Sequence, residues 1–258
     1  MAYTWIPFYK ELAQKLLRFR NDRTPLVNWI YDNLQGYINH LKDAPDGRRV
    51  PDVDPFTVFA IFNRGITDDK RIDICEKFKR FLDVSASVPQ DFDAIPVMNA
   101  KQSNFMAFAD RREEGDLERL WNVFELAVLD KNIEDAYNAL SHQYLIKFNI
   151  TFGLFWIRPD KYLPLDGHSQ DLLASLKITF DRKKFLPYNE YERVMKELNE
   201  KIDEWNRNPC PLMDFWEWLS FEYDDVITGY DLLWNQGNPL MSQVHIIKLK
   251  EVKVDAGI

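Results

Sequence analysis

Arginine and lysine clusters are the groups in this sequence whose type and spacing suit a defined chemistry, the neutralisation of phosphate. Four clusters stand out: Arg18, Arg20 and Arg23; Arg48 and Arg49; Arg111 and Arg112; and Arg182, Lys183 and Lys184. Cations gathered on one face are the electrostatic footprint of proteins that bind nucleic acid. A solvated surface explains any single cluster more simply, so the clusters indicate a candidate face rather than a site.

The charge balance restricts where such a face can lie. The 258 residues carry a formal net charge of −8, which argues against a wholly basic nucleic-acid binder. Residues 185–235 hold 12 Asp and Glu against 4 Lys and Arg, a local balance of −8, so the remainder sums to zero. The sequence therefore permits a nucleic-acid face on the N-terminal two-thirds of the chain.

Catalytic patterns are missing from the sequence. It has no G-x-x-x-x-G-K-[ST] phosphate loop and no G-x-G-x-x-G, H-E-x-x-H, G-x-S-x-G or C-x-x-C motif. The acidic pairs 113–114 and 224–225 are adjacent residues, which point apart on a helix and make no obvious catalytic couple. His168 is expected at a solvent-facing first turn of a helix. We expect a protein that is not itself an enzyme.

Cofactor, disulfide and membrane signals are also missing. Cys75 and Cys210 are too few for a disulfide framework or a zinc site, and the four histidines are scattered. No apolar run approaches the roughly 18 residues that cross a bilayer. The first residues, MAYTWIPFYKEL, lack the basic start and apolar core of a signal peptide. We expect a cytoplasmic protein with no cofactor, no metal and no membrane partner.

Helical periodicity dominates the chain and must position the basic residues. Apolar residues recur at helical spacing over 5–19, 26–38, 56–62, 68–82, 115–129, 133–148, 188–207 and 211–226. The stretches 42–55 and 88–108 are expected to be loops, and 244–254 a strand or linker. This predicts a mainly α, multi-helix globular domain with irregular loops and at most a few short strands. We expect this domain to span residues 1–235, with a sub-boundary near 130–135. Residues 236–258 are expected to form a strand-like tail or linker.

The stretch GLFWIRPDKYLPLDGH, residues 153–168, could be a hairpin, a ligand-lined loop or a helix junction. Helical periodicity before it and the absence of a hairpin turn favour a junction. Pro159 disfavours helix at Arg158, and Asp166 is a good N-cap for the residues that follow. We therefore expect a buried helix, an extended connection that exposes Arg158 and Lys161, and a capped helix.

Several spaced blocks resemble a known family. In chain order they are WIPFYKELAQKLLRFRNDRTPLV, DVDPFTVFAIFNRGITDDKRI, PQDFDAIPVMNAKQS, DLERLWNVFELAV and NITFGLFWIRPDKYLPLD. Together they are similar to the N-terminal specificity region of McrB-like AAA+ proteins of modification-dependent restriction and related phage-defence systems. The similarity covers about residues 5–225 and rests on block order rather than on one motif.

The resemblance implies target recognition of DNA, with a modified base as one option. In that family the region precedes a nucleotide-hydrolysing AAA+ motor, which works with a separate nuclease subunit, so motor and nuclease are the implied partners. This sequence departs from the pattern because it contains no motor domain. The tail at 244–254 is where a motor would begin, unless the protein is a stand-alone relative.

If the domain reads DNA, helix ends and loops would supply the phosphate contacts. The candidates are Arg18, Arg20, Arg23, Arg64, Lys101, Arg158 and Lys161. Trp156 is a conceivable base platform, although its position favours the core. The alternatives are a protein-interaction domain that recruits a nuclease or motor, favoured by the acidic C-terminal third, and an enzyme of unrecognised type.

Overall fold

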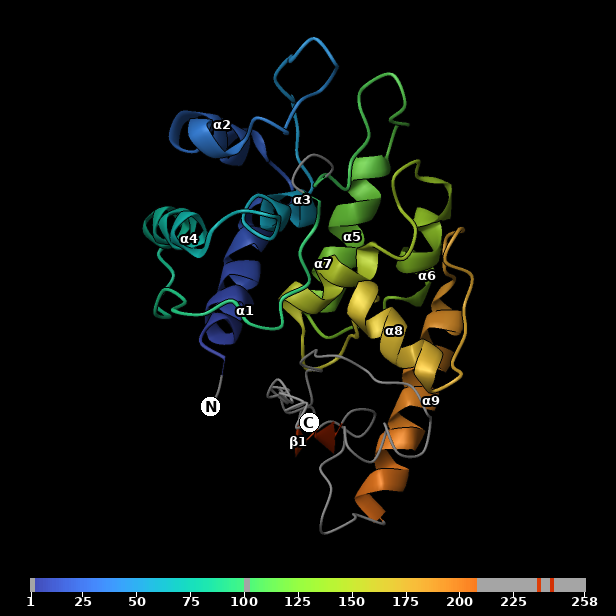
Figure 1. The fold of residues 1–258 in the computed structure, drawn as a ribbon. Coiled ribbons are helices and arrows are strands. Elements are labelled where there is room, and N and C mark those ends of the chain that lie inside the picture. The colour runs from blue at the N-terminus through green and yellow to red at the C-terminus, as the bar shows by residue number, and fades with distance from the viewer. Residues whose placement is uncertain (1–2, 100–102, 208–235, 238–241, 244–258) are drawn as a thin grey trace, which may run out of the picture.

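The computed structural model describes residues 3–99, 103–207, 236–237 and 242–243, with side chains as far as residue 203. The expected mainly α, multi-helix fold is confirmed (Figure 1). In chain order the α-helices, 3₁₀ turns (η) and strands are α1 (Trp5–Leu16), η1 (Leu17–Phe19), α2 (Thr24–Asn33), η2 (Gln35–Tyr37), α3 (Pro55–Ala60), α4 (Asp68–Leu82), α5 (Asp116–Val128), α6 (Glu134–Asn138), η3 (Ala139–His142), α7 (Ile150–Ile157), α8 (Gly167–Ser175), α9 (Tyr188–Arg207), β1 (Gln236–Gly237) and β2 (Ser242–Gln243).

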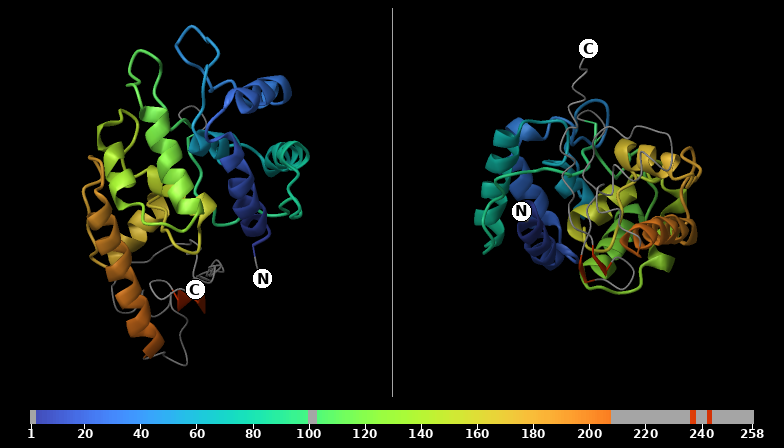
Figure 2. Two further views of the ribbon diagram at one scale, coloured as in Figure 1. Left: turned by 180° about the vertical axis from the view of Figure 1, so that it is seen from behind. Right: turned by 60° about the horizontal axis from the view of Figure 1, so that its bottom comes forward.

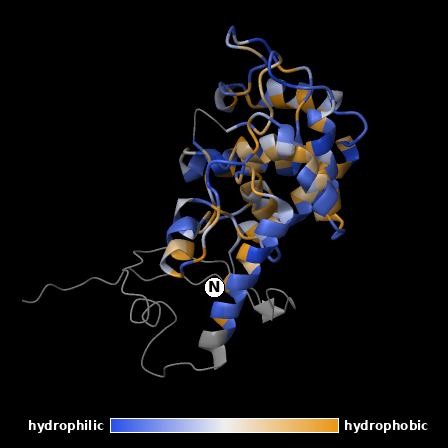
Figure 3. Cartoon of the chain, turned by 90° about the vertical axis from the view of Figure 1, so that its right-hand side faces the viewer, coloured by the Kyte–Doolittle hydropathy of each residue, from blue (hydrophilic) through white to orange (hydrophobic). Residues whose placement is uncertain are grey.

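The helices share one core. α2 and α4 lie on one side of α1 and α3, whereas α5 to α9 lie on the other (Figure 1 and Figure 2). A single cluster of buried apolar side chains runs from Tyr3 to Ile202 and includes residues on both sides of positions 130–135. Hydrophobic and hydrophilic residues alternate around the helices in Figure 3, as expected when each helix buries one stripe. Within the described residues, no helix combines the length and apolarity needed to cross a bilayer.

Helix α7 lies at the centre of this core. Its sequence, ITFGLFWI, is rich in residues that favour strands, but α1, α3 and α5 all contact it and cover its faces. Seven of its eight residues are buried as a result. A short run that is apolar on every side is typical of such a helix, and tertiary packing here overrides the local strand propensity.

Gly153 lets α7 approach α3 closely. A Cβ atom built on Gly153 would lie 2.4 Å from Cδ1 of Phe56, which is shorter than any real carbon–carbon contact between side chains. Phe56 is itself fully buried and packs edge-on against Phe124 of α5, with ring centroids 5.5 Å apart. The absence of a side chain at Gly153 therefore sets the spacing of three helices.

The expected helix junction across residues 153–168 is confirmed. α7 ends at Ile157, and Arg158 leaves the helical region with φ −142° and ψ 67°, as expected before Pro159. Asp166 caps α8 by accepting a hydrogen bond of 2.9 Å from the Ser169 amide.

The aromatic pair at the end of α7 belongs to the core. Phe155 and Trp156 are both buried, and the Trp156 Nε1–H donates to the Pro96 carbonyl oxygen at 2.9 Å. An indole with its N–H satisfied inside the protein is in the position expected of a core residue. Cys75 of α4 is likewise fully buried, as its place on an apolar stripe predicts.

The helix predicted over 133–148 is shorter than expected. α6 ends at Asn138 and η3 at His142, after which the chain runs without helix to residue 149. One tertiary and one local polar bond are made in this segment. The buried Gln143 side chain donates to the Asp116 carbonyl oxygen at 2.9 Å, and the Lys147 amide donates to the Asn149 side chain at 2.8 Å.

The C-terminal predictions fall largely outside the described residues. That applies to the helix expected at 211–226 and to the strand expected at 244–254. β1 and β2, the described part of the tail, pair antiparallel with Gln236 opposite Gln243 and Gly237 opposite Ser242. α9 (Tyr188–Arg207) matches the long charged helix that the sequence predicts.

We expect Gly153→Ala to lower the free energy of unfolding by about 2–3 kcal/mol, because the added methyl group overlaps the Phe56 ring and forces α3 and α7 apart. Urea unfolding followed by circular dichroism measures the change. Gly167→Ala is the matched control, since a Cβ at Gly167 meets nothing within 4 Å; its stability should stay within about 1 kcal/mol of the wild type. Equal losses in the two variants would contradict the close contact.

Candidate nucleic-acid interface

Arg20 and Arg23 both form ion pairs with Glu118 of α5, and we name these three residues the Arg20–Arg23 clamp. Arg20 Nη1 lies 2.5 Å from one Glu118 oxygen and Arg23 contacts the other, while Arg20 Nε lies 3.2 Å from Glu125 and Arg23 Nη1 3.0 Å from Asp52. Burial opposes ionisation of Glu118, but the bonds from Arg23 and Arg20 outweigh it and lower the pKa of this carboxyl. The clamp fastens the corner between α1 and α2 onto α5, and carboxylates balance its positive charge.

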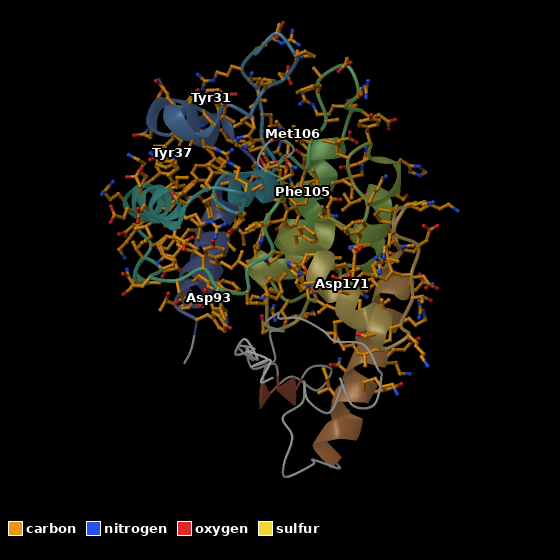
Figure 4. All side chains as sticks on the ribbon, viewed as in Figure 1. Tyr31, Tyr37, Asp93, Phe105, Met106 and Asp171 are labelled. Atoms are coloured by element: carbon orange, nitrogen blue, oxygen red, sulfur yellow. The ribbon has the colours of Figure 1, made fainter. Side chains whose placement is uncertain are left out.

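Arg18 and Arg64 donate to backbone carbonyl groups. The exposed Arg18 donates to the Phe81 carbonyl oxygen at 3.0 Å, with its guanidinium 4.9 Å from the centre of the Phe19 ring. Arg64 Nε donates to the Ile61 carbonyl oxygen at 3.1 Å, and its Nη2 donates to the carbonyl oxygen of Tyr37. Tyr37 lies between α2 and α4 (Figure 4). Both arginines thus tether chain segments of the N-terminal half.

Arg158 and Lys161 share the carboxylate of Asp130. Arg158 binds Asp160 with Nε and Nη2, both at 2.9 Å, while its Nη1 lies 3.2 Å from Asp130 and 3.3 Å from the Ala127 carbonyl oxygen. The Asp160 bonds raise the pKa of Arg158, whereas the bond from Lys161, at 2.9 Å, lowers the pKa of Asp130. The Arg158 side chain is only 13% exposed, so it is less exposed than the sequence predicts.

The structure groups the predicted cations into pairs rather than into one face. Arg20 meets Arg23 at Glu118, and Arg158 meets Lys161 at Asp130. Lys101 lies outside the described residues. An arginine held by carboxylates must release them before it can bind a phosphate, which adds a cost to binding. DNA binding by these residues stays a prediction.

An open cleft of about 270 Å³ lies beside Arg158, between α1 and the C-terminal ends of α5 and α7. Ala13, Val128 and Ile157 form its apolar lining, and Lys10 and Asp130 are its exposed charged residues. The balance of one lysine, one arginine and one aspartate gives the cleft little net field, so it does not favour a polyanion.

Within the described residues, the densest exposed cations lie elsewhere, in the loop between α8 and α9. Residues 177–184, which we name the cation loop, hold four cations against the single carboxylate of Asp181: Lys177, Arg182, Lys183 and Lys184, all exposed. Lys177 and Lys183 have no ion-pair partner within the described part of the chain. Lys184, 82% exposed, lies 3.8 Å from Asp181. The nearest acidic residue of α8 in sequence is Asp171, labelled in Figure 4.

Aromatic rings connect the cation loop to the segment before α7. The Arg182 guanidinium lies 6.0 Å from the centre of the Phe180 ring, which in turn lies 6.5 Å from the ring of Phe148. Lys147, next to Phe148 in the chain, is exposed and has no ion-pair partner among the described residues. Arg193 of α9 anchors the cation loop by donating a hydrogen bond to the carbonyl oxygen of Thr179 at 2.7 Å.

A family model described as "Domain of unknown function (DUF8425)" matches residues 5–209, most of the chain. The chain belongs to the DUF8425 family. No curated protein and no solved structure matches it. The matched range contains the Arg20–Arg23 clamp, the cation loop and every described helix from α1 to α9, so these features lie within the DUF8425 domain.

A buried carboxyl group of the DUF8425 domain, Asp54, is not among the residues that we singled out in the sequence. Asp54 is fully buried at the N-terminus of α3, where it accepts from the Thr57 amide at 2.8 Å and from the Thr57 hydroxyl at 2.5 Å. Burial raises its pKa to about 6. The signal was present, because an Asp before a Pro in D-P-x-T is a helix N-cap pattern.

His168, Glu113 and Glu114 are further titratable residues that we considered in the sequence. His168 lies half-buried in the first turn of α8, where burial lowers its pKa. Glu113 and Glu114 are exposed in the turn before α5. Among the described residues, no three or more His, Cys, Asp or Glu side chains gather where a metal could be held. The feature of the described surface that suits ligand binding is the exposed positive charge of the cation loop and Lys147.

We expect Arg158→Gln to lower the free energy of unfolding by about 1–3 kcal/mol, since the Ala127 carbonyl and the Asp160 carboxylate lose the donor that Arg158 supplies and Asp130 keeps only Lys161. Lys161→Gln, which removes a lysine whose partner Asp130 is 62% exposed, should cost less than about 1 kcal/mol. Chemical denaturation of both variants measures the difference. A loss no larger for Arg158 than for Lys161 would mean that Arg158 is not structural.

We expect Asp54 to stabilise the folded state as the pH falls. Its pKa of about 6 in the folded state lies above the ordinary 3.8, so the proton binds the folded chain more tightly, and this contribution is lost as the pH rises through 6. Between pH 7 and pH 5, wild type should gain about 1 kcal/mol relative to Asp54→Asn. Parallel denaturation curves at the two pH values measure it, and a pH-independent difference would contradict the raised pKa.

Proposed function

We propose that this chain is the target-recognition module of a McrB-like restriction or phage-defence NTPase and that it binds DNA in the cytoplasm. The five blocks that resemble the N-terminal region of those proteins support it. Because the chain carries no phosphate loop, nucleotide hydrolysis would be the work of an AAA+ motor domain or subunit and cleavage that of a nuclease. The role of this chain is then binding, without catalysis or a cofactor.

The observation that carries the proposal is the set of unpaired cations on the cation loop and Lys147. Lys147, Lys177 and Lys183 have no ion-pair partner in the described part of the chain, whereas Arg20, Arg23 and Arg158 each contact two carboxylates. A cation without a partner binds a phosphate without first breaking an ion pair. We therefore place the phosphate contacts on this surface.

The salt dependence of DNA affinity tests this assignment, because counterions are released from DNA when lysine and arginine neutralise its phosphates. Each phosphate neutralised by Lys or Arg contributes about −0.9 to the slope of log affinity against log salt for duplex DNA. Four cations on the loop and Lys147 beside it are enough for several contacts.

We expect a short duplex, with or without 5-methylcytosine, to bind at about 50 mM salt and to dissociate steeply as salt rises. Lys183→Glu with Lys184→Glu should weaken binding at least about 10-fold and reduce the salt slope by about 2. Fluorescence anisotropy of a labelled duplex measures both. Arg80→Glu is the matched control: Arg80 is 68% exposed on α4, which lies on the opposite side of α1 in Figure 1, and its change should leave affinity near that of wild type.

Two outcomes would contradict the proposal. If neither duplex binds at low salt, the domain does not recognise DNA, and a pull-down that returns a nuclease or motor protein without nucleic acid would then favour the protein-interaction alternative. If the Lys183 and Lys184 reversals act no more strongly than Arg80→Glu, the cation loop is not the contact surface.

A further inference from the structure

We propose that Tyr144 and Arg111 form a stacking platform for an unpaired nucleobase, so that this chain binds single-stranded DNA in addition to the duplex that the cation loop contacts. The inference rests on the proposed function and names the class of nucleic acid. It starts from side chains that the fold leaves exposed in two loops, at residues 108–111 and 144–145.

Tyr144 projects from a segment that is fixed on both sides. Gln143 before it is buried and donates to the Asp116 carbonyl oxygen at 2.9 Å, and Ile146 after it is only 2% exposed. Between these two anchors, Tyr144 is 58% and Leu145 38% exposed. A large ring held in solvent by an ordered backbone has already lost much of the conformational freedom that stacking would otherwise cost.

Arg111 lies against this ring. Its guanidinium carbon is 4.8 Å from the centre of the Tyr144 ring, and its Nη1 donates to the Tyr144 hydroxyl oxygen. Phe108, one turn earlier in the same loop, is 38% exposed. The loop is fixed in turn by Arg112, whose Nη2 lies 2.7 Å from the buried Asp43 carboxylate. Two anchored loops thus bring a tyrosine and an arginine into contact, and an exposed phenylalanine lies in the same loop as the arginine.

The platform continues into the cation loop. Lys147 follows Tyr144 by three residues, and the next residue, Phe148, contacts the Phe180 ring, over which the Arg182 guanidinium lies. Proteins that bind single strands combine aromatic rings, on which bases stack, with a row of cations that follows the backbone. The order from Tyr144 through Lys147 to Arg182 has this form.

The charges around Arg111 favour a base over a phosphate at this end. Asp110, Glu113 and Glu114 are all exposed in the same loop as Arg111, and Arg111 is the exposed cation among them. These carboxylates repel a phosphate, whereas the neutral face of a base is not repelled and can stack between a ring and a guanidinium. A regular duplex hides its base faces, so only an unpaired base can use the platform.

We test this with a labelled oligo-dT strand and a duplex of the same length at low salt, by fluorescence anisotropy on the full chain. Tyr144→Ala should weaken dT binding about 10-fold, in the range found for loss of one stacked base, and leave duplex binding unchanged. Tyr144→Phe keeps the ring and should bind dT within about 2-fold of wild type. Circular dichroism confirms that both variants are folded.

The remaining outcomes separate this inference from the proposed function. If the duplex binds but dT does not, or if Tyr144→Ala binds dT as tightly as wild type does, the platform is wrong and DNA binding by the cation loop stands. If Tyr144→Ala and Tyr144→Phe weaken dT binding equally, the hydroxyl contact rather than stacking matters, and the inference is overturned. If neither DNA binds, both proposals fail.

Discussion

The close approach of α7 and α3 is the contact on which the rest of the structure depends. The Phe56 ring occupies the space that a side chain at position 153 would need, so a glycine is required there. That contact lets α7 sit inside the ring of α1, α3 and α5, and α7 in turn sets where Arg158 emerges and where α8 begins. The exposed loops are therefore positioned by an interior that tolerates little change in volume.

The charged residues of this chain lie in two different settings. The arginines of the clamp and of the connection after α7 join elements far apart in sequence, as when Arg20 contacts Glu118 98 residues away. The cations of the cation loop and Lys147 are exposed, and among them Lys147, Lys177 and Lys183 have no ion-pair partner in the described part of the chain. The same residue types therefore occur in both settings, and the presence of an acidic partner separates them.

This difference also explains what the sequence could predict. Local signals were sufficient for the junction at Pro159 and Asp166, for α9 and for the burial of Trp156, because each depends on neighbours within a few residues. The partners of Arg20 and Arg23 could not be predicted, since they depend on tertiary packing over long separations, and neither could the contact of Arg158 with Asp130. The early end of the helix after residue 133 was missed for the same reason: Gln143 leaves the helix for a carbonyl group of α5. Whether the predicted cations bind DNA is decided by experiment, not by the fold.

The bond between Arg193 and the Thr179 carbonyl oxygen has a mechanical consequence. Arg193 also contacts Glu190 and Glu197 along its own helix, so it is fixed to α9 as firmly as to the loop. α9 is 20 residues long, about 30 Å, and leads into the C-terminal part of the chain. The position of the cation loop is therefore tied to the position of the first two turns of α9.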